Sequence, residues 1–330
     1  MKNRTTPMRR RAVTAAALAL IGFGAMPALA QTFPDRPVTL VVGFSPGGSA
    51  DTVARALADE LTKVLGQTVI IDNKAGASGN IATQTVIGKP ADGYSLLFAA
   101  INLATNPWLG GVKYDPMKDL TFVSQITSVP VVMLASNASG FKEPADAEKA
   151  ARAKPGGITA ASGGVGTSSH LALELYKRAK DIPVVHAPYR GGAPANVDLM
   201  AGRVDLMFDL MSGSLKSLVD SERVRPLAVM QAERLKSLPN VKSAAELGLP
   251  ESTYIRSWQG IAVRSGTPAD IVQKLNAAVV KAANSPSFKA RAEGLGSDVV
   301  TNTPAAFQAY YVTELNRWQA LIKAANITVE

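Results

Sequence analysis

The sequence of 330 residues contains no cysteine, which excludes disulfide bonds, thiolate nucleophiles and cysteine-ligated metal centres. Histidine is almost as scarce, with only His170 and His186. His170 and Glu174 are four residues apart, a spacing that places two metal ligands on one face of a helix. Because no third or fourth ligand is evident, we expect neither a metal site nor any other cofactor.

No long run of lysine and arginine appears beyond residue 11, and this absence bears on the partners of the protein. The formal net charge of +9 comes largely from the first 30 residues, which hold five of the 35 basic residues and no acidic one. The other 300 residues carry 30 basic and 26 acidic side chains, a net charge of +4. Without a basic patch, we expect no nucleic-acid partner.

The first 30 residues have the organisation of a secretory signal. A basic head is followed by an apolar run from Ala12 to Met26 and by small residues at Ala28 and Ala30, which is the pattern of a cleavable export signal. A membrane anchor is the alternative, but the apolar run is shorter than the ~20 residues that span a bilayer. We therefore predict a signal peptide at residues 1–30 and a periplasmic protein without disulfides.

The common nucleotide-binding motifs are also missing. A P-loop requires a lysine after its last glycine, and a dinucleotide fingerprint requires three glycines in the pattern G-x-G-x-x-G. The stretch GVGTSS at 164–169 has Ser169 where the third glycine belongs, and GFSPGG at 43–48 lacks the middle glycine. Both departures disfavour nucleotide binding.

Strand and helix patterns alternate along the remaining chain. Strands are predicted at 38–42, 68–73, 94–100, 129–135, 183–189, 204–209 and 225–230, a strand–loop–helix unit at 157–179, and helices near 268–283 and 304–325. This alternation is typical of an α/β fold with mostly parallel sheets. Because 300 residues exceed the usual size of a single core, we expect two lobes with a ligand cleft between them.

Two glycine-rich stretches each separate a predicted strand from a predicted helix. They are SPGGSAD at 45–51 and SGGVGTSS at 162–169. Backbone N–H groups at such a helix start form an anion site, and the hydroxyls add neutral donors. Each stretch alone could be a tight turn with a serine or threonine cap. Two of them, at the sheet edges where α/β proteins bind ligands, favour a carboxylate ligand.

Catalysis is the main alternative at the second stretch. Ser168 and His170 lie close together at the predicted helix start and could act as nucleophile and base. The G-x-S-x-G nucleophile elbow is absent, however. We expect His170 to form a local hydrogen bond at the helix terminus and His186 to be buried in a strand, and we predict a protein that is not an enzyme.

Ordered blocks along most of the chain resemble one family. They include GFSPGGSADTVARALADEL, GQTVIIDNKAGASGNIAT, KPGGITAASGGVGTSSHLALELY, VVHAPYRGGAPANVDLMAGRVDLMFD and SWQGIAVRSGTPADIVQKLNAAV. These blocks resemble the Bug-type periplasmic receptors of tripartite tricarboxylate transporters. The resemblance implies a type II periplasmic-binding-protein fold, in which two α/β lobes joined by two crossover strands close on a small carboxylated solute.

The resemblance also implies where the solute binds. The first loop would hold one end of the solute through backbone groups and ordered waters, and Thr167 and Ser168 would meet its other carboxylate. Asp51 is expected to order the first loop rather than to touch the solute. The candidate ligand-binding residues are Phe44, Ser45, Gly47, Gly48, Ser49, Asn106, Ser162, Gly166, Thr167, Ser168, Tyr189 and Asp209. One departure from the family pattern is Leu103, which stands where the family often has histidine.

The expected organisation is a signal peptide at 1–30, a first lobe at 31–131 plus 257–330, and a second lobe at 132–256. The crossovers between lobes are predicted at 131–134 and 257–263. We expect a monomer whose partners are the solute and the membrane subunits of a tripartite transporter. A sensory receptor for a signalling protein is the remaining alternative.

Overall fold

The computed structural model describes residues 33–109, 112–325 and 327. The predicted signal peptide at 1–30 lies outside these ranges. Chain contacts divide the protein into a short unit that ends at Asp35 and a large unit that begins at Arg36, and all the strands belong to the large unit. None of the described helices is long and apolar enough to cross a membrane.

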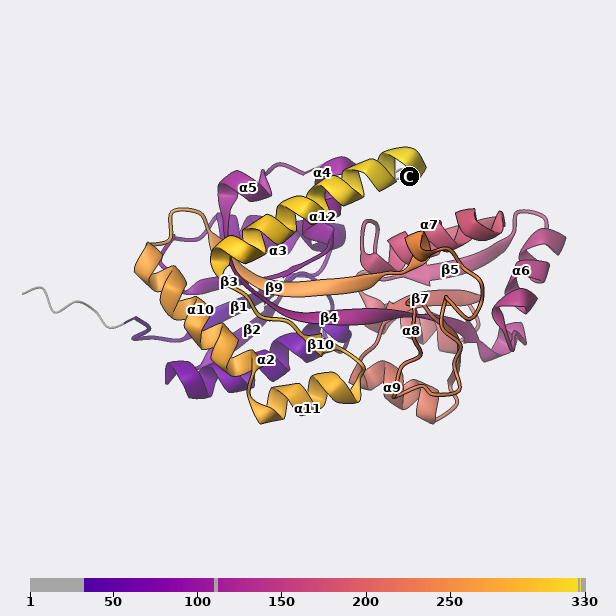
Figure 1. Ribbon diagram of the computed structural model, residues 1–330, viewed down its shortest axis with the longest axis horizontal. Coiled ribbons are helices and arrows are strands. Elements are labelled where there is room, and N and C mark those ends of the chain that lie inside the picture. The colour runs from indigo at the N-terminus through magenta and orange to yellow at the C-terminus, as the bar shows by residue number, and fades with distance from the viewer. Residues whose placement is uncertain (1–32, 110–111, 326, 328–330) are drawn as a thin grey trace, which may run out of the picture. The chain divides into compact units, whose positions relative to one another are not determined.

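The described residues contain ten strands in one continuous arrangement (Figure 1). In chain order they are β1 (Val38–Val42), β2 (Val69–Asn73), β3 (Ser95–Ala100), β4 (Leu120–Ser136), β5 (Ile158–Ser162), β6 (Val184–Pro188), β7 (Leu206–Leu210), β8 (Val224–Val229), β9 (Arg256–Arg264) and β10 (Asp298–Val299). The spatial order is β2-β1-β3-β9-β4-β7-β5-β6, and β8 and β10 also pair with β4. The predicted strands at 38–42, 94–100 and 183–189 thus coincide closely with β1, β3 and β6.

The long strand β4 belongs to two sheets. Its residues 120–130 pair with β9, and its residues 131–135 pair with β7. We call the sheet of β2, β1, β3, β9 and β10 the first half and the sheet of β7, β5, β6 and β8 the second half. The change of partner at Val131 falls at the start of the predicted crossover 131–134, and the other predicted crossover, 257–263, lies within β9 (Figure 1).

The sheets are mixed, which corrects the expectation that they are mostly parallel. The outer pairs β1–β2, β1–β3, β5–β6 and β5–β7 are parallel. The pairs that involve β4 or β9 are antiparallel. The reason is topological, because β4 carries the chain out of the first half and β9 runs back alongside it. The alternation of strand and helix patterns in the sequence therefore predicts the parallel pairing of the outer strands only.

Helices cover both faces of these sheets. They are α2 (Ser49–Leu65), α3 (Asn80–Ile87), α4 (Asn102–Leu109), α5 (Pro116–Asp119), α6 (Pro144–Ala153), α7 (Ser168–Lys180), α8 (Gly192–Met200), α9 (Gly213–Asp220), α10 (Ala269–Ala283), α11 (Pro286–Gly294) and α12 (Pro304–Ala325). Side chains of β4 alternate between two cores, with Val131 and Met133 in one and Val132 and Leu134 in the other. This alternation is the period-2 geometry of a strand that is covered on both faces.

Two loops connect strand ends to helix starts at equivalent places. The first loop, residues 43–48, joins β1 to α2, and the second loop, residues 163–167, joins β5 to α7. Each loop lies at the carboxyl end of a parallel strand, where open α/β sheets place their ligands. The fold therefore brings both predicted glycine-rich stretches to sheet edges.

Candidate functional site

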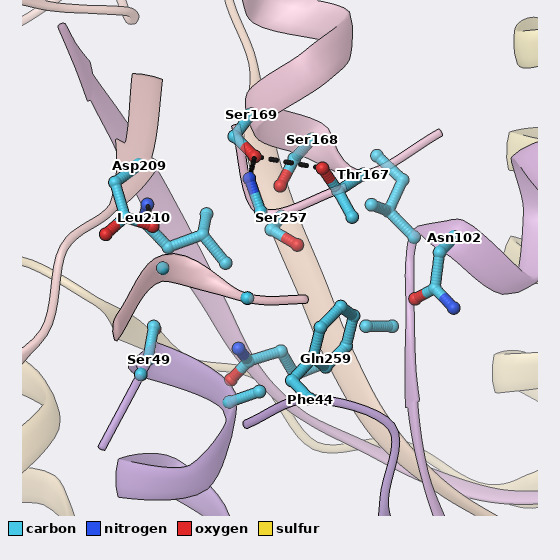
Figure 2. Close-up of a pocket in the computed structure, with 17 residues that line it drawn as sticks. Phe44, Ser49, Asn102, Thr167, Ser168, Ser169, Asp209, Leu210, Ser257 and Gln259 are labelled. Atoms are coloured by element: carbon cyan, nitrogen blue, oxygen red, sulfur yellow. Dashed lines mark hydrogen bonds between the residues drawn. The ribbon is translucent and has the colours of Figure 1, made fainter. Parts of the chain in front are cut away.

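A pocket lies between the two loops and is bordered by both halves (Figure 2). It encloses about 470 Å³ of space, counting the part that is open to solvent. Its lining consists of Phe44, Gly48, Ser49, Ala50, Ala100, Ile101, Asn102, Gly163, Thr167, Ser168, Ser169, Gly191, Gly192, Asp209, Leu210, Ser257 and Gln259. The described lining residues include no lysine, arginine or histidine.

Three helices begin at this pocket. Ser49 begins α2, Ser168 begins α7 and Gly192 begins α8, and all three line the pocket. The first helical hydrogen bonds are donated by Thr52 in α2 and by Leu171 in α7, so the N–H groups before them have no acceptor inside the helix. These N–H groups and the positive end of each helix dipole create an anion site without a basic side chain.

Asp51 orders the first loop from the first turn of α2. Its carboxylate accepts hydrogen bonds from the backbone N–H of Gly47 at 2.9 Å, from Arg55 at 2.9 Å and from Asn73 at 3.0 Å. Asn73 also donates to the carbonyl of Phe44 at 3.1 Å. Burial opposes ionisation of Asp51, but the hydrogen bonds from Arg55, Gly47 and Asn73 outweigh it and hold the pKa of this carboxyl below its ordinary value. The carboxylate is fully engaged away from the pocket lining.

The second loop is ordered by neutral hydroxyls. Thr167 is the N-cap of α7, and its hydroxyl donates to the carbonyl of Gly164 at 2.6 Å and lies 2.9 Å from the hydroxyl of Ser169. The Ser169 hydroxyl accepts a hydrogen bond from the backbone N–H of Gly163 at 2.9 Å. In contrast, the Ser168 hydroxyl has no hydrogen-bond partner among the described residues and lines the pocket. Among the hydroxyls of Thr167, Ser168 and Ser169, that of Ser168 is thus the one free to bind a solute.

His170 and His186 lie behind the second loop and support it. Nδ1 of His170 accepts the backbone N–H of Gly166 at 3.1 Å, and Nε2 of His186 is 2.6 Å from the hydroxyl of Ser162. The two imidazole rings stack with their centroids 4.2 Å apart. Burial lowers the pKa of His170 to about 4 and that of His186 to about 3, so both rings are neutral near pH 7.

This arrangement does not provide a catalytic pair. Nδ1 of His170 is engaged by Gly166, and no hydrogen bond joins His170 to Ser168 in the described chain. His170 and Glu174 approach to only 3.9 Å. The described residues contain no group of three or more histidine, cysteine, aspartate or glutamate side chains that could hold a metal ion.

Asp209 is the one ionisable group among the described lining residues, and it is buried. Its carboxylate accepts the backbone N–H of Leu210 at 2.8 Å and the Asn196 amide at 3.1 Å. It also lies against Gly192, where an added Cβ would meet its oxygens at 2.5 and 2.6 Å. Burial raises the pKa of Asp209 to about 7, and its two neutral donors offset only part of this effect.

Each of three further polar side chains that line the pocket has one atom without a hydrogen-bond partner. Asn102 Oδ1, Ser257 Oγ and Gln259 Nε2 are buried atoms that have no partner among the described residues. An unsatisfied buried polar atom costs about 1–3 kcal/mol, so a solute or ordered water that pairs with these atoms would be stabilised at this position. Sequence reasoning missed all three residues. Their one local signal is position, since Asn102 follows the end of β3 and Ser257 and Gln259 alternate along β9.

The family is settled by comparison with known proteins. The model of the tripartite tricarboxylate transporter family receptor matches residues 53–327. The chain belongs to this family. The structure of the periplasmic binding protein BugD is similar with a TM-score of 0.85 and 30% identity, covering 90% of this chain and 100% of that one.

Two further similar structures were solved with a ligand. An R. palustris protein with adipate has a TM-score of 0.85 and 34% identity, covering 90% of this chain and 99% of that one. MatC from Rhodopseudomonas palustris with bound malate has a TM-score of 0.82 and 31% identity, covering 88% of this chain and 100% of that one. These likenesses confirm the two-lobed α/β fold of periplasmic binding proteins. As a member of this family, the chain is a solute-binding receptor and not an enzyme.

The structure brings half of the twelve candidate residues to the pocket. Those that line it are Phe44, Gly48, Ser49, Thr167, Ser168 and Asp209. Those that do not are Ser45, Gly47, Asn106, Ser162, Gly166 and Tyr189. The backbone of Gly48 has a negative φ of −80°, whereas Gly47 has the left-handed φ of +84°. Of the two glycines, only Gly47 needs the conformational freedom that glycine provides.

Two of the candidate residues outside the pocket form hydrogen bonds within their own half. Asn106 donates to the Ser78 carbonyl at 3.0 Å and to Asn80 at 2.8 Å, and the Tyr189 hydroxyl donates to Asp198 at 2.6 Å. Leu103, the departure from the family pattern, is buried in the core and lies outside the pocket lining.

Hydrogen bonds at the rim of the pocket connect the halves. The Ser45 hydroxyl donates to the Arg190 carbonyl at 2.8 Å, and the Ser214 hydroxyl donates to the Gly47 carbonyl at 2.8 Å. On another side, Thr105 donates to the Gly166 carbonyl at 2.6 Å. Both loops are therefore in direct contact with the opposite half.

Proposed function

We propose that the protein is an exported receptor that captures a small carboxylate solute in the periplasm for uptake by a tripartite tricarboxylate-type transporter. The observation that carries this proposal is the pair of helix starts, α2 and α7, which face one pocket without any basic side chain. A carboxylate fits such a site because free N–H groups and helix dipoles stabilise an anion. The unpartnered Ser168 hydroxyl adds a further donor.

The related structures support the chemical class of the solute. One of them is a structure with adipate and the other a structure with bound malate, and both solutes are carboxylates. In our proposal, one carboxylate meets the start of α7 at Ser168 and Ser169, and the other end of the solute meets the start of α2 at Gly48 and Ser49. Thr167 and Asp51 act by holding these two helix starts in place.

The proposal extends to domain organisation and partners. We propose that residues 31–131 with 257–330 form the first lobe, that residues 132–256 form the second, and that residues 131–134 and 257–263 are the crossovers. The change of strand partner at Val131 supports the first crossover. The receptor would act as a monomer and deliver its solute to the membrane subunits of the transporter.

Titration calorimetry tests the proposed ligand class. The protein, unfolded and refolded to remove any bound solute, would be titrated with mono-, di- and tricarboxylates and, as controls, with uncharged amides of the same length. We expect at least one carboxylate to bind and its amide to bind far more weakly, because a neutral amide gains little from the helix dipoles. Equal binding of acid and amide, or no binding of any carboxylate, would contradict the proposal.

Solution scattering tests the contact between the lobes. Both helix starts can reach one solute only when the lobes are close together, so a saturating ligand should favour that state. We expect a smaller radius of gyration with the ligand identified by calorimetry than without it. A larger radius on binding would argue against ligand-driven closure.

A further inference from the structure

The pocket contains hydrogen-bond acceptors as well as donors. Of the seventeen described residues that line it, Asp209 alone has an ionisable side chain, and none of them is a cation that could neutralise it. A carboxylate solute accounts for the donors at the starts of α2 and α7. It does not account for acceptors, because an ionised carboxylate offers no hydrogen to donate.

Asn102 presents one such acceptor in a fixed orientation. Its amide nitrogen donates to the carbonyl of Ser78 at 2.7 Å. Turning the amide around would set two oxygen atoms against each other, so the nitrogen position is defined by this bond. The amide oxygen is consequently left on the side of the pocket, where it is buried and has no partner among the described residues (Figure 2).

Asp209 presents the second acceptor on the other side of the pocket. Figure 2 shows Asp209 and Asn102 at opposite sides, with Ser168 and Ser257 between them. The Asp209 carboxylate accepts only two hydrogen bonds, from Leu210 and Asn196, although a carboxylate has about four acceptor positions. The two groups that donate to it are neutral, so a donor or a cation from the solute would fill the remaining positions.

An unsubstituted dicarboxylate fits this set of groups poorly. It would leave Asn102 Oδ1 unsatisfied, and it could approach Asp209 only after that carboxylate had taken up a proton. We propose, on the basis of the proposed function, that the solute carries a hydroxyl or ammonium group in addition to its carboxylate, and that a hydrogen bond to Asp209 selects this donor. Hydroxyl and ammonium groups both donate hydrogen bonds, as this acceptor requires, and the relative affinities of solutes that carry one or the other distinguish the two.

Matched solutes of equal length test the donor. Calorimetry on the refolded full chain would compare succinate with malate and aspartate, and adipate with 2-aminoadipate. In whichever series binds more tightly, we expect the solute with a hydroxyl or ammonium group to bind at least about tenfold more tightly than the unsubstituted acid. This is the gain expected for one added hydrogen bond to a charged group. If the unsubstituted acids bind equally well or better, this inference is wrong while the proposed function stands. If no carboxylate of any series binds, the proposed function itself fails.

The variant Asp209→Asn tests the residue that selects the donor. For an ammonium-bearing solute we expect a ten- to hundredfold loss of affinity, with a smaller loss for a hydroxyl-bearing one, because the amide oxygen still accepts from a hydroxyl. Affinity for the unsubstituted acid should stay the same or rise, since a negative charge is removed. Asp205→Asn is the control, because Asp205 precedes the same strand but does not line the pocket.

The pattern across solutes separates selection from general damage. A uniform loss for all solutes in Asp209→Asn would show that Asp209 is structural and would overturn its role as a selector. A donor preference that is unchanged in Asp209→Asn would overturn it as well. Thermal unfolding of the ligand-free variant verifies that it is folded.

Discussion

The first and second loops occupy equivalent places in the two halves, yet different interactions order them. In the first loop, an ionised carboxylate, Asp51, holds Gly47 and is bound by Arg55, whose side chain is 53% exposed. In the second loop, the neutral side chains of Thr167, Ser169 and His170 perform the same task, and all three are buried.

The difference follows from the surroundings of each loop. An ionised group is tolerated where a partner reaches solvent, whereas a buried loop avoids the cost of desolvating a charge. Both solutions leave the helix start free to bind an anion. Acid, glycine substitution and loss of single hydroxyls should therefore affect the two loops differently.

The largest effect is expected from Gly166→Ala in the second loop. Gly166 has a left-handed φ of +74°, and an added Cβ would lie 2.7 Å from Leu109, 2.9 Å from Asn106 and 3.0 Å from Thr105. We expect a loss of stability of about 2–5 kcal/mol from backbone strain and overpacking. We also expect binding to be lost, since the overlap is with the opposite half.

Two glycine variants serve as comparisons for this prediction. Gly47→Ala in the first loop shares the left-handed backbone but has only Ala193 nearby, at 3.8 Å, so about 1–2 kcal/mol is expected. Gly213→Ala has open space around it and should change stability by less than about 0.5 kcal/mol. Urea unfolding measures all three, and equal effects at Gly166 and Gly47 would argue against close packing at the second loop.

Acidification is expected to reduce the stability that the histidines of the second loop contribute, and to leave the contribution of Asp51 in the first loop unchanged down to about its ordinary pKa. The folded pKa values of about 4 for His170 and about 3 for His186 lie below the unfolded value of 6.5. The unfolded state therefore binds more protons in this window, and stability falls as the pH falls from 6.5. At about pH 5, each histidine should cost on the order of 2 kcal/mol. Asp51, with a lowered pKa, loses its contribution only below its ordinary value of 3.8.

Asp209 changes the stability in the opposite direction over the same pH range. The histidine effect should therefore be measured in a variant that lacks this carboxylate. Its folded pKa of about 7 lies above the ordinary 3.8, so stability rises as the pH falls from 7 toward 3.8. We would follow urea unfolding of Asp209→Asn between pH 7 and 5, together with the amide signals of Gly166 and Gly47. A stability that does not change over this range would contradict the neutral, buried state of the histidines.

Ser168→Ala is expected to reduce affinity without reducing stability. The Ser168 hydroxyl has no partner among the described residues, so its removal costs only the bond to the solute. A hydrogen bond to a charged group is worth about 1.5–3 kcal/mol, or about ten- to a hundredfold in affinity.

Ser169→Ala is the matched control, because the Ser169 hydroxyl binds the backbone N–H of Gly163. It should lower stability by about 0.5–1.5 kcal/mol and reduce affinity less than Ser168→Ala does. Calorimetry measures the affinity of both variants, and thermal unfolding measures their stability. Wild-type affinity in Ser168→Ala would show that this hydroxyl does not bind the solute.

The smallest effect is expected from Asp51→Asn in the first loop. Asparagine keeps one acceptor oxygen but loses the charge that attracts Arg55, so we expect a loss of about 1 kcal/mol at neutral pH. Because the folded pKa of Asp51 is lowered, the difference from wild type should shrink as the pH falls through that pKa. The loss of affinity should be smaller than for Ser168→Ala. Abolished binding would instead indicate direct contact between Asp51 and the solute.

Much of the fold could be predicted because the signals are local. The apolar run at 38–42 coincides with β1, and the threonine that precedes the helical pattern is the N-cap of α7, at Thr167. By contrast, only 129–135 of the 17-residue β4 was predicted, because its first part, 120–128, lacks a simple alternation. The helix α4 was not predicted either, since Pro107 lies inside it and an Asn-Pro pair normally indicates a turn.

Some features of the candidate site could likewise be predicted from the sequence, and others could not. The chain order of glycines, hydroxyls and helix patterns determined, by itself, that two helix starts would offer free N–H groups, because capping and turn chemistry depend on near neighbours. The sequence alone also determined that no thiol and no disulfide takes part.

Only the tertiary structure decided which side chains face the solute. The pairing of β4 with β9 and of β4 with β7 brings Gln259 and Asp209 to one pocket, although the two residues are 50 positions apart in the sequence. Likewise, the hydroxyls of Thr167 and Ser169 form hydrogen bonds with the backbone of the second loop, whereas the hydroxyl of Ser168 between them has no partner among the described residues. The physical reason is that burial and hydrogen-bond satisfaction depend on contacts between distant segments, and a single residue's neighbours along the chain do not specify them.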